Sequence, residues 1–147
     1  MKIKSSKFIA IFIIVVLQSC QAKAQSQSTT DRTLIEEKIA MYFEGWLTGD
    51  SNLLGQAMHS TCQLKNIKDG KVIIIDRPTY LGFFKPRARL ENAGGKIIKI
   101  DVTGPIGAAK IELETANRLY TDYFNLMKEN GEWYIVDKIS TSINKVE

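Results

Sequence analysis

Asp122 is the residue of this sequence best placed to move a proton, because it interrupts an apolar run. Residues 118–128 read RLYTDYFNLMK, and side chains along an extended strand alternate between two faces. The alternation predicts one face with Tyr120, Asp122, Phe124 and Leu126, and another with Thr121, Tyr123, Asn125 and Met127. A carboxylate among aromatic and aliphatic side chains is costly unless it is hydrogen-bonded or protonated. Asp122 is therefore predicted to be either a general base or a structural acid.

His59, the single histidine of the chain, is the second candidate for acid–base chemistry. An imidazole titrates near neutral pH, so His59 could pair with Asp122 as an acid–base couple. A solvent-exposed or capping histidine is the alternative. One histidine and one cysteine in the mature chain do not supply enough ligands for a metal ion. The sequence also lacks a Ser/His/Asp elbow, a phosphate-binding glycine loop and a dinucleotide fingerprint. We expect neither a metal nor a cofactor.

Aromatic residues are spread along the whole chain and could line a pocket for a planar ligand. The predicted pocket residues are Tyr42, Trp46, Tyr80, Phe83, Tyr120, Phe124 and Trp133. Taken singly, each of these aromatic residues is more often part of a plain core. Cys62 could be a thiol nucleophile, but a small buried residue is the expected role.

The elements that must position these residues follow from hydrophobic periodicity and turn signals. Apolar residues spaced by three and four predict a long helix from about Asp31 to Thr48, which Gly49 would end. A short helix is predicted from Asp50 or Ser51 to about Met58, and another from Arg77 to about Lys85. Turn signals separate six predicted strands, at Cys62–Lys68, Lys71–Ile75, Lys96–Thr103, Ile106–Thr115, Arg118–Lys128 and Glu132–Ser140.

This order of elements predicts the fold class. Strands that run together beside segregated helices indicate an α+β domain rather than a parallel α/β sheet. We expect a curved antiparallel six-stranded sheet wrapped around the long N-terminal helix, with two further short helices. One face of such a sheet must bury the apolar stripe of the helix.

The first 30 residues are predicted to be a targeting segment rather than part of the fold. Three lysines precede an apolar run at residues 8–17, which is typical of a signal peptide and too short for a stable membrane span. Leu17-Gln18-Ser19-Cys20 resembles a lipobox, which implies cleavage before Cys20 and lipid attachment to this residue. The alternative is cleavage after Ala22-Lys23-Ala24, which would release a soluble protein.

These motifs divide the chain into three parts: a signal peptide at 1–19, a polar tether at 20–30 and one domain at 31–147. We expect a membrane-anchored lipoprotein or, failing that, a soluble periplasmic or secreted protein. Of the 20 Lys and Arg, three precede Cys20, so the formal net charge of +4 falls to about +1 after cleavage. Because no nucleic-acid motif accompanies the basic residues between Lys71 and Lys110, we expect a solvated face there and no nucleic-acid partner.

Several short motifs distributed over residues 31–141 occur together in one known family. They are Tyr42 with Gly45-Trp46 and Gly49-Asp50, His59, Arg77 with Tyr80, Thr121-Asp122-Tyr123-Phe124 with Leu126 and Lys128, and Gly131-Glu132-Trp133 with Ile135-Val136 and Lys138. In this pattern the chain resembles the nuclear-transport-factor-2-like, or SnoaL-like, cone-fold superfamily, and within it the putative lumazine-binding branch. The resemblance implies a cystatin-like cone with the element order described above.

The resemblance leaves the function open, because the superfamily includes isomerases, dehydratases, polyketide cyclases, ligand-binding modules and dimeric adaptors. We predict an exported small-molecule-binding or interaction domain with a partly apolar cone pocket and without demonstrable catalysis. One alternative is a cofactor-free lyase or isomerase that uses Asp122 as general base with His59 and with Tyr42 or Tyr80. The other is a dimeric scaffold through the outer sheet face. The expected partners are a small apolar or planar ligand, a possible second copy, and a membrane only through the lipid anchor.

Overall fold

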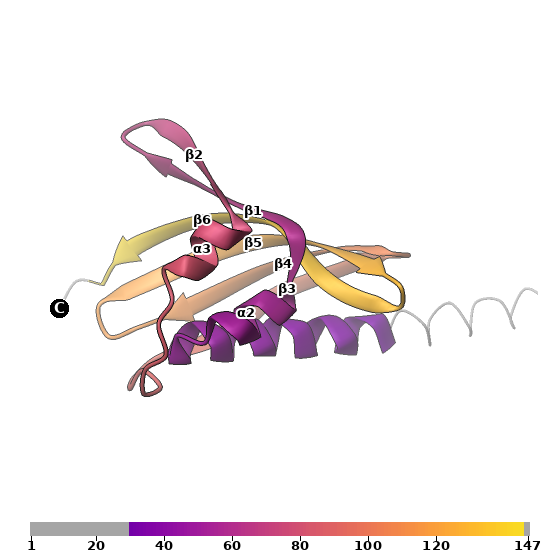
Figure 1. Ribbon diagram of the computed structural model, residues 1–147, viewed down its shortest axis with the longest axis horizontal. Coiled ribbons are helices and arrows are strands. Elements are labelled where there is room, and N and C mark those ends of the chain that lie inside the picture. The colour runs from indigo at the N-terminus through magenta and orange to yellow at the C-terminus, as the bar shows by residue number, and fades with distance from the viewer. Residues whose placement is uncertain (1–29, 146–147) are drawn as a thin grey trace, which may run out of the picture.

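The N-terminal helix spans residues 30–48 and lies along one side of the molecule (Figure 1). The computed structural model describes residues 30–145, so the predicted signal peptide, Cys20 and most of the predicted tether lie outside the described residues. Ile35, Ile39 and Tyr42 of the predicted apolar stripe are fully buried. The helix ends at Gly49, whose φ of 67° is the left-handed conformation that glycine adopts without strain.

The remaining elements agree with the sequence prediction, with shifts of a few residues at their ends. They are α2 (Ser51–Ala57), β1 (Met58–Lys68), β2 (Lys71–Asp76), α3 (Arg77–Gly82), β3 (Gly94–Thr103), β4 (Ile106–Glu114), β5 (Arg118–Glu129) and β6 (Glu132–Asn144). Asp50 begins α2 by accepting hydrogen bonds from the backbone amides of Asn52 and Leu53. Asp69 and Gly70 both have positive φ, as a tight hairpin between β1 and β2 requires. The α+β prediction is confirmed.

The six strands form one sheet in the order β2-β1-β6-β5-β4-β3, which curves over the N-terminal helix (Figure 1). The sheet is mixed, because β1 pairs with β6 in parallel, for example at Leu64 and Lys138. The prediction of a wholly antiparallel sheet was therefore wrong at this pairing. Hairpin turns force the other neighbouring strands to be antiparallel, whereas β1 and β6 are joined by a long crossover that sets no direction locally.

The core lies between the helices and the inner, concave face of the sheet. Its fully buried side chains include Ile35, Ile39 and Tyr42 from the helix, Leu54 from α2, and Ile111, Phe124, Leu126, Trp133 and Ile135 from the sheet. Within residues 30–145, no helix is both long and apolar enough to span a membrane.

Candidate functional site

Asp122 lies on the inner face of β5 with only 3% of its side chain exposed, which confirms the predicted strand face. Both of its carboxylate oxygens have a donor. The Lys138 ammonium lies 2.7 Å from Oδ2, and the Ser140 hydroxyl donates a hydrogen bond of 2.5 Å to Oδ1. These contacts supply the stabilisation that a buried carboxylate needs.

Lys138 and Ser140 face the interior because β6 carries a β-bulge. Leu126 pairs with Ile135 but Asn125 pairs with Asp137, so Val136 is an extra residue on β6. Trp133 and Ile135 point inward before the bulge, and strict alternation would then place Asp137 inside and Lys138 outside. The extra residue reverses that phase. Neither Lys138 nor Ser140 is among the predicted site residues, because alternation alone places both on the outer face.

Two tyrosines complete the polar group in the interior. The Tyr42 hydroxyl, from the N-terminal helix, and the Tyr80 hydroxyl, from α3, lie 2.7 Å apart in a buried hydrogen bond. The Lys138 ammonium is 5.9 Å from the centroid of each ring, within the range of a cation–π contact. We call Tyr42, Tyr80, Asp122, Lys138 and Ser140 the interior polar cluster.

Burial controls the protonation of this cluster. Loss of solvation lowers the pKa of the Lys138 ammonium, and the Asp122 carboxylate beside it opposes that effect. Burial likewise raises the pKa of the Tyr42 hydroxyl well above its ordinary value, and it raises that of Tyr80. Cys62, buried nearby on β1, has its thiol pKa raised to about 12 by burial. The tyrosines and the thiol are therefore protonated donors at neutral pH, and Cys62 is not an activated nucleophile.

His59 does not join the cluster. Its Nε2 lies 3.3 Å from the Glu129 carboxylate, and its Nδ1 lies 2.8 Å from the Thr61 hydroxyl. Glu129 follows Asp122 by seven positions on β5, which is roughly 23 Å of strand. The predicted acid–base couple of Asp122 and His59 is therefore not formed. His59 is a half-buried residue beside an exposed acid at the other end of the strand.

The predicted pocket aromatics separate into groups rather than lining one cavity. Tyr42 and Phe124 are buried in edge-to-face contact, and Tyr80 contacts Phe84. Trp46 is only half-buried and touches Phe84 and Tyr120 near the end of the N-terminal helix. Two of the predicted pocket residues lie apart from these groups. Phe83 is 64% exposed, and Trp133 lies at the start of the N-terminal helix, where its indole N–H donates to Asp31.

Two open grooves lie on the opposite, outer face of the sheet. One of about 570 Å³ is lined by residues that include Ile106, Asn125 and Met127. The other, of about 390 Å³, lies where the β1–β2 hairpin diverges from β5 and β6, beside Ile67 and Tyr123. Ser140 is the one member of the interior polar cluster that lines either groove, and it lines the second. Among residues 30–145, no group of His, Cys, Asp and Glu is arranged to hold a metal ion.

Solved structures with this architecture come from several bacteria. An NTF2-like protein of unknown function from Shewanella baltica OS155 superposes with a TM-score of 0.72 at 25% identity, over 80% of this chain and 97% of that one. NTF2-like proteins of unknown function from Silicibacter pomeroyi DSS-3 and Methylobacillus flagellatus KT give TM-scores of 0.70 and 0.68 at 16% and 22% identity. These matches cover 80% of this chain, and 98% and 94% of those chains.

The family comparison agrees with the fold comparison. No curated protein matches this chain. A family model described as putative lumazine-binding matches residues 30–140, which is nearly all of the described domain. The chain therefore belongs to the putative lumazine-binding family of NTF2-like, SnoaL-like cone proteins.

Proposed function

We propose that this domain binds a small planar molecule in its cone and recognises the polar edge of that molecule with the interior polar cluster. The observation that carries the proposal is the buried pair of Asp122 and Lys138. Replacing a buried ion pair with apolar residues of similar volume is often neutral or stabilising by about 1–4 kcal/mol. Because two apolar residues could stabilise the fold as well as Asp122 and Lys138 do, fold stability does not explain why this pair is present. Binding of a ligand by the two charged groups does.

The chemistry of the cluster suits a heterocycle with both donors and acceptors at one edge. Lys138, Ser140 and the two tyrosine hydroxyls can donate, while the Asp122 carboxylate and the hydroxyl oxygens can accept. Phe124 and Tyr42 offer apolar ring surface beside these groups. The description of the family as putative lumazine-binding supports the same class of ligand.

Access to the cluster requires movement of α3. Tyr80 is the member of the interior polar cluster that lies on α3, a helix of six residues. The hydrogen bond between Tyr80 and Tyr42 joins α3 to the N-terminal helix. The hydroxyls of both tyrosines become available to a ligand when that bond opens. Hydrogen exchange should therefore slow at α3 when ligand is bound and remain unchanged at β3 and β4.

The test combines native mass spectrometry of the purified protein with calorimetric titration of lumazine and related bicyclic heterocycles. The variant is Asp122→Leu with Lys138→Met, which should fold but lose both co-purifying mass and heat of binding. The matched control is Lys65→Met with Asp137→Leu, an ion pair on the outer face between β1 and β6. Equal binding by both double variants would exclude the interior polar cluster as the site.

A second copy of the chain is the next candidate partner, and the outer sheet face favours it. Apolar side chains on that face are at least half exposed: Ile67, Val72, Ile74, Tyr123, Met127, Ile139 and Ile143. Tyr123 and Ile139 are cross-strand neighbours in its middle. Contiguous apolar surface of this kind is typical of interfaces. Light scattering should give a dimer mass that Tyr123→Glu reduces to a monomer, while Phe83→Glu, just after the end of α3, leaves the dimer intact.

Export with lipid attachment at Cys20 remains a proposal from the sequence motifs. Radiolabelled palmitate should label the wild-type protein but not Cys20→Ala, and both proteins should leave the cytoplasm. A wild-type protein that is exported without label would favour cleavage after Ala24 instead.

A further inference from the structure

Two arginines flank a pair of half-buried aromatic rings at the end of the cone where the N-terminal helix stops. Trp46 and Tyr120 meet edge to face with their ring centroids 5.3 Å apart. The Arg87 guanidinium lies 5.8 Å from the Trp46 ring, and that of Arg118 lies 5.9 Å from the Tyr120 ring. Both arginines are exposed.

Neither guanidinium is neutralised by a carboxylate within residues 30–145. Arg87 donates one hydrogen bond, of 2.7 Å, to the Trp46 carbonyl, which fixes it beside the indole. The neighbouring acid Glu44 is already paired with Arg89. A guanidinium that stacks on an aromatic ring keeps the N–H groups at its edge available, and these groups match the geometry of a carboxylate or phosphate.

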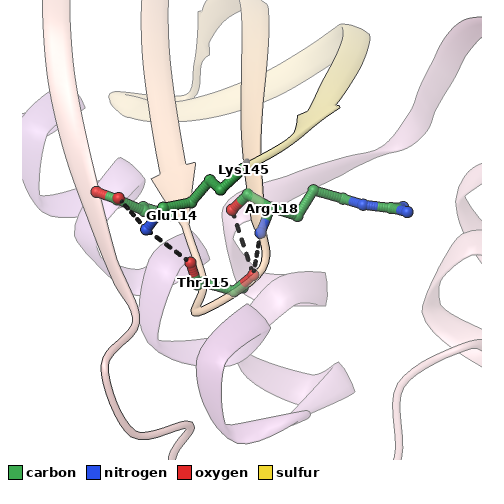
Figure 2. A network of polar contacts seen from close by, with 4 residues as sticks. All are labelled: Glu114, Thr115, Arg118 and Lys145. Carbon is green, nitrogen blue, oxygen red and sulfur yellow. Dashed lines mark hydrogen bonds and ion pairs between the residues drawn. The ribbon is translucent and has the colours of Figure 1, made fainter. Parts of the chain in front are cut away.

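The Arg118 side chain is directed away from Glu114 (Figure 2). Thr115 and Arg118 close the β4–β5 turn through their backbones and the threonine hydroxyl. Lys145 donates to Glu114 at 2.6 Å, and the Arg118 guanidinium extends away from both (Figure 2). The polar network therefore orders the arginine backbone and leaves its charge free.

This arginine pair is connected to the interior polar cluster by a row of contacting rings. Tyr120 is two residues from Asp122 on the same strand face, or about 7 Å. Trp46 contacts Phe84, and Phe84 contacts Tyr80 of the cluster at a centroid distance of 5.0 Å. The two guanidinium groups lie at this end of the row, Arg87 beside the Trp46 ring and Arg118 beside the Tyr120 ring.

We infer that Arg87 and Arg118 select ligands that carry an anionic group, so that the ligand is a planar ring bearing a carboxylate or phosphate. Its ring would reach the interior polar cluster, and its anion would stay at the arginines. The inference rests on the proposed function and specifies the chemical class of its ligand.

The test uses two pairs of probes that differ only in an anionic group: lumazine with 6-carboxylumazine, and riboflavin with flavin mononucleotide. Titrations of the full protein should show that the anionic member of at least one pair binds about tenfold more tightly. Arg118→Gln should reduce that preference about tenfold and leave the affinity for the neutral member unchanged. Arg87→Gln should act in the same direction, and rising salt should weaken only the anionic member.

Arg89→Gln is the matched control, because this arginine already binds Glu44 and should not affect selectivity. Equal affinity for both members of each pair, or a preference that survives both arginine variants, would overturn the inference while leaving the proposed site in place. If no probe binds and the native mass spectrum shows no bound molecule, both proposals fail together.

Discussion

Among residues 30–145, Asp31 and Asp122 are buried aspartates that each pair with a lysine, and the two pairs differ in what they connect. Asp31 lies in the first turn of the N-terminal helix and accepts from Lys128 at 2.6 Å and from the Trp133 indole at 3.2 Å. Those partners flank the β5–β6 turn, 97 and 102 residues along the chain. This pair attaches the helix to the sheet, and 22% of the Lys128 side chain remains exposed.

The pair of Asp122 and Lys138 joins two strands that are already hydrogen-bonded to each other along their whole length. Its side chains are 3% and 5% exposed, so both charges lose nearly all of their hydration. An apolar pair could hold β5 and β6 together equally well. A buried ion pair that connects segments distant in the chain has an evident structural role. A buried ion pair between two strands that are already hydrogen-bonded to each other has no such role and is a candidate site.

The largest expected effect comes from breaking the interior pair on one side. Lys138→Met leaves the Asp122 carboxylate buried without its cation, so the free energy of unfolding should fall by about 3–5 kcal/mol. Adding Asp122→Leu should restore the stability, because no unpaired charge remains. Urea denaturation of the single and double variants measures both values. A double variant as unstable as the single one would show that the pair itself stabilises the fold.

The pair at the helix start should behave differently. Asp31→Asn weakens two hydrogen bonds to a charged acceptor, and the loss should be about 1.5–3 kcal/mol. Ligand binding should not change, since the interior polar cluster is intact. Arg32→Gln, which removes an exposed pair with Glu36 in the same turn, is the control and should cost under about 0.5 kcal/mol. Lost binding by a folded Asp31→Asn protein would remove the distinction between the two pairs.

The burial of Cys62 should make the free energy of unfolding depend on pH in the alkaline range. Burial raises the pKa of the Cys62 thiol from its ordinary value of 9.0 to about 12, so above pH 9 the unfolded chain ionises while the native thiol keeps its proton. Stability therefore falls as the pH rises, by up to about 1.4 kcal/mol per pH unit from this group. Cys62→Ala should reduce the slope of the unfolding free energy between about pH 9 and 11. An unchanged slope would mean that the thiol is accessible in the native state.

Substitution of His59 should have the smallest effect on stability, and it serves as the reference for the substitutions in the two ion pairs. Its contact with Glu129 is largely exposed, and exposed ion pairs contribute about 0–1 kcal/mol. His59→Gln should change stability by less than about 1 kcal/mol and leave ligand binding as in the wild type. Calorimetric titration at pH 6 and pH 8 measures the second point. A histidine that controls binding would place the site at the opposite end of β5.

Helix and strand periodicity and turn signals predict most of the fold. One inserted residue in β6, Val136, prevents them from predicting which β6 side chains face the site. The helix stripe, the Asp69-Gly70 turn and the inward face of Asp122 follow from periods of 3.6 and 2. Val136 disturbs the period of 2, and with it the assignment of Lys138 and Ser140. No short-range rule marks a bulge whose extra residue is an ordinary valine.

Long-range pairing was the other limit. The parallel contact of β1 with β6 and the meeting of Tyr42 with Tyr80 depend on how distant elements pack, as does the position of His59. The same holds for Trp133, whose partner Asp31 lies 102 residues earlier in the chain. Residue type suggested that these side chains could do chemistry, but only the topology decides which of them meet.

The parallel pairing of β1 with β6 has a consequence for the order of folding. Asp122 and Ser140 are 18 residues apart within one hairpin, whereas Lys65 and Asp137 on β1 and β6 are 72 residues apart. Closing the longer loop costs about 1.2 kcal/mol more in chain entropy, so the β5–β6 hairpin should form before β1 docks. In that order of folding, the Lys138 ammonium and the Asp122 carboxylate meet while both are still hydrated. They lose their water only when β1, α3 and the N-terminal helix close over them. Stopped-flow refolding of the double variant Asp122→Leu with Lys138→Met should accordingly be faster than that of the wild type, and an equal rate would place dehydration after the folding barrier.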